Sequence, residues 1–417
     1  MIAVEVSAKD RIFARAHEIG FDLVGVASAE PFATAETIFQ NRARNGLLAN
    51  WSYPPAVIER ICRPQTVLPG ARSIICTATS YLTEHEPYDP NAPGLLGFVS
   101  SHAWGRDYHR VIGSRLRALA DFVMTEFPGA RCLPCVDTGP MIDRAAAVRA
   151  GIGWFGKNAN VLTREFGSWV LLGELITTLD LPADEQLLKN CGQCVECINR
   201  CPTGAIGADG QVDARRCISD LTQLKSSIPR ELRPAIGNRL WGCDDCQTVC
   251  PVNERKAVAG RSRSSKVFEP LPRIGTAVDL PSVLRMTKSQ FRRWFGPTSM
   301  AWRGKGVLQR NAAVALGNSR DPAAVEPLIE ALDDRKPLVR GHAAWALGQL
   351  VCALATSTNG ENCGSALSER ALTALQLLLE REPDSWVREE AELALDAIRS
   401  QMPSAGVAVE STRPSGA

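Results

Sequence analysis

Eight of the fourteen cysteines in this 417-residue chain have the spacing that iron–sulfur clusters require. The first run reads C-x2-C-x2-C-x3-C-P, as in bacterial-type ferredoxins, and consists of Cys191, Cys194, Cys197 and Cys201. The second run reads C-x2-C-x3-C-P and consists of Cys243, Cys246 and Cys250. Cys217, the only other cysteine between the two runs, completes the set of eight.

The ligands of the two clusters can be assigned from the ferredoxin pattern, in which the fourth cysteine of a run binds the neighbouring cluster. We expect one 4Fe-4S cluster on Cys191, Cys194, Cys197 and Cys250, and the other on Cys201, Cys217, Cys243 and Cys246. Two zinc sites are the alternative, because C-x2-C is also a zinc-knuckle spacing. Zinc requires neither the third cysteine nor the Cys-Pro ending, and both occur here. Since neighbouring clusters conduct single electrons, the cysteines predict electron transfer.

The remaining composition is that of a large globular protein. Apolar residues make up 45% of the chain, and no segment approaches the ~20 apolar residues that span a bilayer. Residues 1–30 lack the apolar core and cleavage site of a signal peptide. In such a chain, many cysteines indicate metal ligation or redox chemistry rather than disulfides. We therefore expect a cytoplasmic protein without a membrane anchor.

A strongly basic segment lies within a chain whose net charge is only +2. Residues 255–310 contain thirteen Lys and Arg against two acidic residues, so this segment carries +11 and the remainder −9. Aromatic residues lie among these cations, including Phe291, Trp294, Phe295 and Trp302. Cations bind phosphates and aromatic rings stack on unpaired bases, so the segment predicts a nucleic-acid-binding surface. For any single residue, a solvated connector or a packing aromatic is the alternative.

The first part of the chain, residues 1–185, predicts an α/β domain. Short β-branched runs at 21–26 and 73–78 are typical of strands, and residues 108–127 have the periodicity of an amphipathic helix.

Residues 186–282 join the cysteine segment, which folds around its metal rather than around an apolar core, to a basic connector that begins near Asn253. Residues 283–400 predict α-helical repeats. Residues 401–417 are rich in Pro, Ser, Gly and Ala and predict a disordered tail.

The helical part contains an internal repeat. QRNAAVALG at 309–317 matches RGHAAWALG at 340–348 at a period of 31, and VREEAELAL at 387–395 is a third copy. An insertion near 355–365 lengthens the second interval, and we expect it to form a surface loop. A period near 30 with small residues at the helix contacts is typical of HEAT-like repeats, which stack into a solenoid.

A glycine pattern at 151–156 has the G-x-G-x-x-G spacing of a dinucleotide fingerprint. That motif requires a strand before it and a helix after it, whereas here a helix-like run at 141–150 precedes it and strand-like runs at 160–163 and 169–172 follow. We predict a helix-to-strand turn instead of a nicotinamide site.

His102 and the six cysteines outside the cluster set do not belong to a sequence motif that would indicate a functional site. His102-x-x-Gly105 lacks the Asp of a cobalt-ligating signature, because Ser100 holds that position, so we expect a packing or surface histidine. Cys132-x2-Cys135 could be a redox pair, but it lies on an apolar stretch and we interpret it as structural. The remaining cysteines are predicted to be plain small residues, namely Cys62, Cys76, Cys352 and Cys363.

The order of these parts resembles that of epoxyqueuosine reductases, and the resemblance extends from about residue 8 to 400. Short strings carry it: WGRDYH at 104–109, VDTGP at 136–140, AGIG and GKN at 150–158, RCIS at 216–219, GNRL and GCD at 237–244, and WRGK and QRN at 302–311.

The resemblance implies an α/β domain that binds cobalamin, two clusters that deliver electrons, and reduction of epoxyqueuosine to queuosine at the wobble base of tRNA, the last step of queuosine biosynthesis. It implies a tRNA with a GUN-type anticodon as partner, an external low-potential electron donor of the flavodoxin or ferredoxin type, and a monomer.

Asp137 matches the family's catalytic aspartate, the proposed proton donor to the departing epoxide oxygen. A carboxyl stays protonated near neutral pH only where burial raises its pKa, and the apolar run at 131–136 leads us to expect such burial. The alternative is that Asp137 caps a helix beginning near Pro140.

The same matching implies a set of cobalamin contacts, with Arg63 as an alternative to the first: Arg60, Ser100, Asp137, Val161, Leu172, Ser219 and Gln223. As tRNA contacts we expect five cations: Lys225, Arg303, Lys305, Arg310 and Arg340.

Two other functions fit part of the sequence. An electron-transfer subunit would need only the cysteine segment, and it would leave the α/β domain and the basic segment unexplained. A reductive dehalogenase-like cobalamin enzyme acting on a small molecule would not need a basic surface the size of a tRNA.

Overall fold

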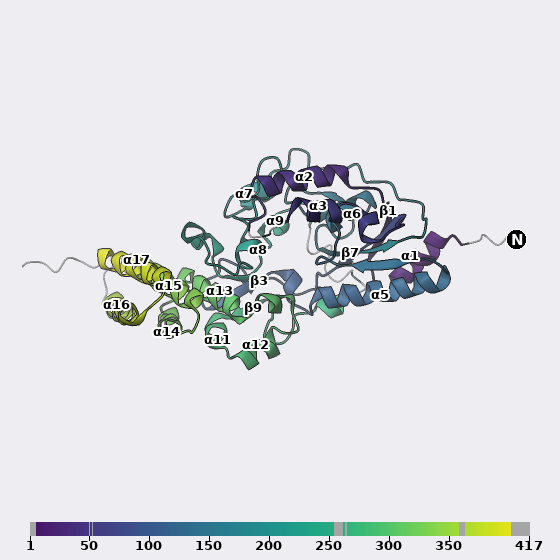
Figure 1. Cartoon of the computed structure of the whole chain (residues 1–417). Helices are drawn as coiled ribbons and strands as arrows, with labels where there is room; N and C mark the ends of the chain where they lie inside the picture. The colour runs from purple at the N-terminus through teal and green to yellow at the C-terminus, as the bar shows by residue number, and fades with distance from the viewer. Residues whose placement is uncertain are drawn as a thin grey trace, which may run out of the picture.

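The computed structural model describes residues 6–49, 51, 53–253, 262, 265–357 and 363–401. Figure 1 shows an elongated molecule with a helix-covered sheet at one end and helical repeats at the other. The cysteine segment lies between them and contains three short helices: α7 (Glu196–Arg200), α8 (Ile218–Leu221) and α9 (Asp245–Thr248).

A four-stranded antiparallel sheet forms the core of the N-terminal part. Its strand order is β1-β2-β7-β4, with β1 at Leu23–Ser28, β2 at Ser73–Ser80, β7 at Val170–Thr177 and β4 at Cys132–Cys135. All eight residues of β2 are buried, because helices cover both faces of the sheet. The strands predicted at 21–26 and 73–78 are confirmed, with β1 displaced and β2 extended by two residues.

Two groups of helices enclose this sheet. Apolar residues of α1 (Ala8–Ile19) and α5 (Tyr108–Glu126) pack on one face, against Val26 and Ile75. The helix predicted at 108–127 is therefore confirmed, and its buried side chains recur at the helical period. The opposite face is covered by α2 (Ala33–Arg44), α3 (Pro55–Ile61), α4 (Pro64–Val67) and α6 (Asp143–Arg149).

The glycines at 151–156 form the turn from α6 into β5 (Trp154–Phe155), which pairs with β6 (Val161–Leu162). Gly151 has φ of +69°, and a Cβ there would lie 2.4 Å from the carbonyl oxygen of Glu185. The predicted helix-to-strand turn is confirmed, and the glycine meets a steric demand rather than binding a phosphate.

A second sheet joins distant parts of the chain. Its strand order is β8-β3-β9, from β3 (Leu96–Val99) in the first part, β8 (Arg239–Trp241) in the cysteine segment and β9 (Ala277–Asp279) beyond it. β3 pairs with β8 in parallel and with β9 antiparallel. The cysteine segment is thus held at the side of the N-terminal part by backbone hydrogen bonds.

The helical repeats are confirmed as stacked helices. The three repeat copies lie on α13 (Lys305–Asn318), α15 (Pro337–Ser357) and α17 (Ser385–Gln401), with α15 packed between the other two. A Cβ on Gly317 would lie 2.7 Å from Ala346, and one on Gly348 would lie 2.9 Å from Ala394. These glycines let neighbouring helices approach closely, which explains the small residues of the repeat.

Further helices complete the structure. The α-helices are α11 (Leu280–Arg285), α12 (Lys288–Trp294), α14 (Val325–Ala331) and α16 (Cys363–Arg381). The 3-10 helices are η1 (Ser101–Ala103), η2 (Arg230–Leu232), η3 (Pro234–Ile236), η4 (Ser265–Phe268), η5 (Ser299–Arg303) and η6 (Pro322–Ala324).

One stretch of α15, residues 337–355, is long and apolar enough to cross a membrane, but 67% of its tested window is buried inside the protein. Since α15 lies between α13 and α17, this composition is that of a core helix.

Several predicted segments extend outside the described residues. Much of the basic connector, from 254 to 264, lies outside them apart from Ser262, as does the tail from 402 onward. The predicted insertion loop is bounded by the end of α15 and the start of α16, and positions 358–362 and the Cys363 side chain lie outside. The domain boundaries at 185, 282 and 400 stay predictions.

Arg310 joins the repeats to the cysteine segment. Its side chain is fully buried, and the guanidinium donates to the carbonyl oxygens of Ser226 (2.8 Å), Leu221 (3.1 Å) and Thr222 (3.3 Å). Burial lowers its pKa to about 9, so it remains protonated at neutral pH. The expectation that Arg310 contacts tRNA is therefore wrong, because every donor direction faces the protein interior.

Two further buried contacts reinforce this junction. The neutral ring of His342 on α15 accepts the Ile228 N–H at 3.2 Å. Glu390 on α17 forms ion pairs with Arg233 (2.6 Å) and Arg230 (2.9 Å). Each of the three repeat helices thus contributes at least one buried polar residue to the stretch that follows Cys217.

Replacing Arg310 with Met is expected to lower the free energy of unfolding by about 3 kcal/mol, because buried carbonyl oxygens lose their charged donor. Chemical denaturation of the cluster-loaded protein measures this change. Arg335→Met, at an exposed position before α15, is the matched control. A stable Arg310→Met protein that only bound RNA more weakly would restore the surface-contact interpretation.

Candidate functional site

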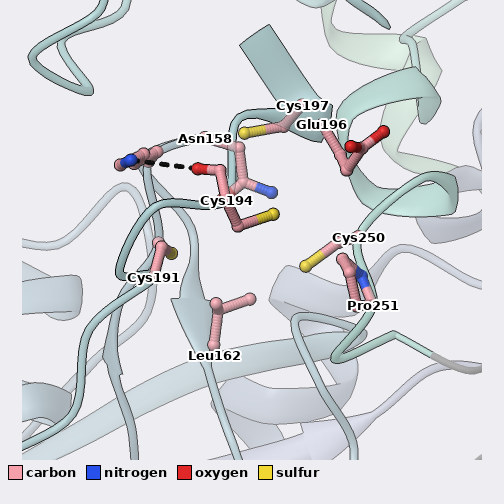
Figure 2. Close-up of a pocket in the computed structure, with 10 residues that line it drawn as sticks. Asn158, Leu162, Cys191, Cys194, Glu196, Cys197, Cys250 and Pro251 are labelled. Carbon is pink, nitrogen blue, oxygen red and sulfur yellow. Dashed lines mark hydrogen bonds between the residues drawn. The ribbon is translucent and has the colours of Figure 1, made fainter. Parts of the chain in front are cut away.

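Four of the eight cysteines surround one small cavity. Figure 2 shows the side chains of Cys191, Cys194, Cys197 and Cys250 around it, although Cys250 lies more than fifty residues along the chain from the others. Burial raises the pKa of the Cys197 thiol, and the neighbouring Cys191 and Cys250 raise it further. The structure thus brings together the four residues predicted for the first cluster.

The other four cysteines include three whose thiols are strongly affected by burial, namely Cys217, Cys243 and Cys246. Burial raises the pKa of Cys246, and the nearby Cys243 and Cys217 add to that shift. Burial also raises the pKa of Cys217, with a smaller contribution from Cys201. Thiolates in such surroundings are costly without a compensating positive charge, which iron supplies when a cluster is bound. The grouping fits the ligand set predicted for the second cluster.

Zinc and a 4Fe-4S cluster make different demands on four cysteines. Zinc would draw four sulfurs to about 2.3 Å from one point, whereas a 4Fe-4S cluster needs its four thiolates around a space for several atoms. The four thiols of the first group line a cavity.

Lys157 and Asn158 hold the loops of the two cysteine groups. The Lys157 ammonium donates to the carbonyl oxygens of Gly192 and Cys194, both at 2.9 Å. The Asn158 side-chain amide donates to the Cys246 carbonyl oxygen at 3.1 Å. The string that ends the glycine pattern therefore connects the N-terminal part to both predicted clusters.

Asp137 lies in the loop after β4 with an unusual φ of +34°. Its Oδ2 accepts the hydroxyl of Tyr108 at 2.5 Å and contacts the His109 Nε2 at 3.2 Å. The other ring nitrogen of His109 contacts Asp107 Oδ1 at 2.7 Å, and the rings of Tyr108 and His109 stack with centroids 4.0 Å apart. The start of α5 thus presents a tyrosine and an imidazole to one carboxylate.

The expectation that burial keeps Asp137 protonated is wrong for this arrangement. The hydrogen bond from His109 lowers the pKa of Asp137, and its side chain is 57% exposed. Burial alone would lower the pKa of His109, but hydrogen bonds to Asp107 and Asp137 outweigh it and raise the pKa to about 9. At neutral pH the proton of this pair is on His109. The capping alternative is not supported, since Ile142 is the N-cap of α6.

A chain of hydrogen bonds and one ring contact connects this site to the second cysteine group. Asp244, between Cys243 and Cys246, accepts the Ser100 hydroxyl at 2.6 Å. The Ser100 hydroxyl also contacts the His102 Nδ1 at 2.7 Å, and the His102 ring packs edge-on against Tyr108. His102 is thus the packing residue predicted.

The predicted cobalamin contacts fall into small groups. The side-chain amide of Gln223 donates to the Ser219 carbonyl at 3.0 Å, and Val161 and Leu172 pack in the same apolar cluster beneath the sheet. Arg63 is engaged by Glu36 and Glu59, whereas the Arg60 side chain is exposed on α3. Of these two arginines, Arg60 is the one available to a ligand.

The cysteines of β4 fit the structural interpretation. Cys135 faces the buried Glu174 across the sheet, and burial raises the pKa of its thiol to about 12. Cys132 donates to Thr177. Both thiols are free and protonated, so neither is a ready nucleophile for a redox pair.

The remaining predicted tRNA contacts differ in availability. Lys225 is exposed, and Arg303 and Lys305 are partly exposed near the start of α13. Arg340 is committed to Glu382 through two hydrogen bonds of 2.6 Å and to the Asp334 carbonyl. That engagement argues against a phosphate contact by Arg340. Phe295 is fully buried and serves as a packing aromatic.

Sequence reasoning missed the roles of Tyr108, His109, Lys157 and Asn158, although all four stand in strings quoted for the resemblance. A hydroxyl and an imidazole beside Asp107 were a usable signal for a proton-handling site. No sequence signal indicated the contact between Ser100 and Asp244, because these residues lie 144 positions apart.

Three family models match parts of the chain. The 4Fe-4S double cluster binding domain matches residues 190–253, the model described as epoxyqueuosine reductase QueG, DUF1730, matches 62–138, and HEAT repeats match 304–396. With the geometry above, these matches define the class: an oxidoreductase with two 4Fe-4S clusters and a HEAT-repeat region.

The chain belongs to the epoxyqueuosine reductase family. It is 38% identical over 392 residues to the epoxyqueuosine reductase of Bacillus cereus. This alignment covers 94% of this chain and 97% of the relative. The epoxyqueuosine reductase of Escherichia coli is 34% identical, and the alignment covers 80% of this chain and 87% of the relative.

Solved structures agree. A crystal structure of epoxyqueuosine reductase with a tRNA-Tyr epoxyqueuosine-modified tRNA stem loop has a TM-score of 0.83 at 36% identity, covering 94% of this chain and 98% of that one. The enzyme from Streptococcus thermophilus has a TM-score of 0.80 at 32% identity, covering 95% and 100%.

Replacing Lys157 with Met is expected to lower the reduction potential of the first cluster, because loss of a nearby positive charge disfavours added negative charge. Potentiometric titration followed by electron paramagnetic resonance measures the shift. Lys189→Met removes a lysine that lies over the Trp154 ring and forms no hydrogen bond to the cysteine loops among the described residues; it is the control. Equal potentials in both variants would contradict the assigned role.

His109 is expected to titrate near pH 9 rather than near its ordinary value of about 6.5. Because its pKa is raised by folding, its ion pairs stabilise the fold fully below about 6.5 and cease to do so as pH rises through 9. NMR of protein labelled at histidine measures the titration, with His109→Gln to assign it. Asp107→Asn should move the pKa downward; a wild-type value near 6.5 would contradict the arrangement.

Proposed function

We propose that this protein reduces epoxyqueuosine to queuosine at the wobble position of tRNA, with electrons delivered through its two clusters. The observation that carries the proposal is the chain of contacts from Asp244 through Ser100 and His102 to Tyr108 and Asp137, which consists of hydrogen bonds and one edge-on ring contact. This chain supports a role for Asp137 beside the electron-transfer segment. The relatives named as epoxyqueuosine reductases support the same reaction.

The residues available for a cobalamin cofactor fit such a group. Ser100 and Ser219 lie near the second cysteine group, Val161 and Leu172 supply apolar surface, and the exposed Arg60 suits a phosphate of the nucleotide tail. When bound, the cofactor would supply a low-valent cobalt centre as the strong reductant that epoxide opening requires. All seven predicted contacts stay proposals, as does the assignment of each cysteine to a cluster.

The chain itself would manage the protons of the reaction. Converting an epoxide to an alkene consumes two electrons and two protons, and the oxygen leaves as water. His109, which carries the proton of the pair at neutral pH, would supply that proton through Asp137 to the departing oxygen. Tyr108 would orient the shared Oδ2 through its 2.5 Å hydrogen bond.

Partners follow from this reaction. The substrate would be a tRNA with a GUN-type anticodon, contacted by Lys225, Arg303 and Lys305, and the reaction would take place in the cytoplasm. An external low-potential donor of the flavodoxin or ferredoxin type would reduce the clusters. A monomer remains our expectation.

Anaerobic turnover with cobalamin, a low-potential reductant and tRNA carrying epoxyqueuosine tests the proposal, with mass spectrometry of nucleosides to detect the loss of one oxygen. We expect wild type to convert the nucleoside, and Asp137→Asn and Asp137→Ala to be slower by at least about 100-fold, since general acids contribute roughly that much. Asp121→Asn, at an exposed position on α5, is the control.

The other outcomes point to the alternative functions. If cobalamin and both clusters bind but the nucleoside is unchanged, the protein is a reductase of a small molecule. If cobalamin does not bind, an electron-transfer subunit is the better interpretation.

A further inference from the structure

The two exposed tryptophans of this protein lie against each other. Of nine tryptophans, only Trp51 and Trp302 belong to the exposed class, with 38% and 52% of their surface open to solvent. Trp51 precedes α3 and Trp302 lies in η5, yet their ring centroids are 5.9 Å apart with an interplanar angle of 28°. Exposed aromatic surface from distant parts of the chain is thus gathered at one place.

A guanidinium completes the group. The Arg303 Cζ lies 3.5 Å from the centroid of the Trp302 ring and 4.9 Å from that of Trp51. The Asp220 carboxylate attracts this guanidinium electrostatically. The group thus combines a cation with partly exposed ring surface, a combination that single-stranded nucleic acids bind well.

The group adjoins the proposed reaction site. The Trp51 Nε1 donates to Asp220 Oδ1 at 2.6 Å, and Asp220 lies on α8, which begins directly after Cys217 and includes Ser219. The exposed Lys225 follows a few residues later. A ligand on the two tryptophans would thus be next to the surface at which the target base must be presented.

A purely structural contact between two parts of the chain does not account for the exposure of Trp51 and Trp302. Tryptophans that only hold two parts together are expected to bury their rings, because burial of apolar area supplies the stabilisation. Here more than half of Trp302 stays in water within a basic segment. Unpaired nucleobases match such a surface, since every base has a π-face and the adjacent phosphates are negative.

We propose that Trp51, Trp302 and Arg303 form a stacking platform for an unpaired nucleobase of the anticodon loop, adjacent to the nucleotide that is reduced. The platform rests on the proposed function, and it gives Arg303 a stacking role in addition to a contact with phosphate. Trp51, from the N-terminal part, would then share substrate binding with the helical repeats.

Fluorescence anisotropy with a synthetic anticodon stem-loop RNA tests the platform on the cluster-loaded protein. Trp302→Ala and Trp51→Ala are expected to raise the Kd roughly tenfold, in line with the loss of one stacked base. Trp302→Phe keeps an aromatic face and should retain most of the affinity. Leu377→Ala, at a similarly exposed position on α16, is the matched control and should bind as wild type does.

A fully paired RNA duplex of the same length distinguishes stacking from attraction to phosphate. Its weaker binding should be equal in wild type and in both tryptophan variants, whereas Arg303→Gln should weaken binding of either RNA and reduce its salt dependence. Stem-loops with 2-aminopurine at successive loop positions provide a readout in wild type: one position should be quenched on binding, and Trp302→Phe should alter that quenching.

The platform is overturned if the tryptophan variants bind the stem-loop with unchanged Kd, or if no loop position is quenched in wild type, while epoxyqueuosine is still converted. In that case the two tryptophans form only a structural contact within the protein. A failure of the proposed function is seen separately, as absence of conversion by wild type, and it leaves the RNA-binding result to stand by itself.

Discussion

Among the described residues, no carboxylate pairs with the buried guanidinium of Arg310, which donates instead to carbonyl oxygens of the segment after Cys217. Because a buried charge without hydrogen bonds is strongly destabilising, α13 and this segment can fold only together. Lys157 and Asn158 make the corresponding contacts from the N-terminal side. The segment also packs apolar residues between Ile218 and Trp241 into the core of the repeats, so buried polar contacts and apolar packing together hold its shape.

The proton-handling site shows how location in the fold separates carboxyl groups of similar type. Asp137 is exposed and paired with His109, which lowers its pKa. Asp143 and Glu174 lie deeper, where burial raises the pKa of Asp143 to about 6 and that of Glu174 well above its ordinary value. The exposed Asp137 is thus the carboxyl group of the three that exchanges protons with its surroundings, whereas Glu174 stays neutral beneath it.

Spacing within the sequence was enough to predict the cysteine groups, the repeat helices and the turn at 151–156, because each depends on residues close together in the chain or on a repeated pattern. The pKa of Asp137 could not be predicted from its apolar neighbours 131–136, since it depends on the approach of His109 from another element. The burial of Arg310 was missed for a related reason: a basic segment reveals its charge, but not which of its cations turn inward.

The sheet β8-β3-β9 has a consequence for how the protein is made. β3 pairs with residues 239–241 and 277–279, which are synthesised much later. At about 5–20 residues per second, the interval between synthesis of β3 and of its last partner is on the order of ten seconds or more. During this interval the cysteines emerge before the strand that closes the sheet. Cluster insertion and closure of this sheet are thus late, linked events, and a chain truncated before β9 would leave its thiols open to oxidation.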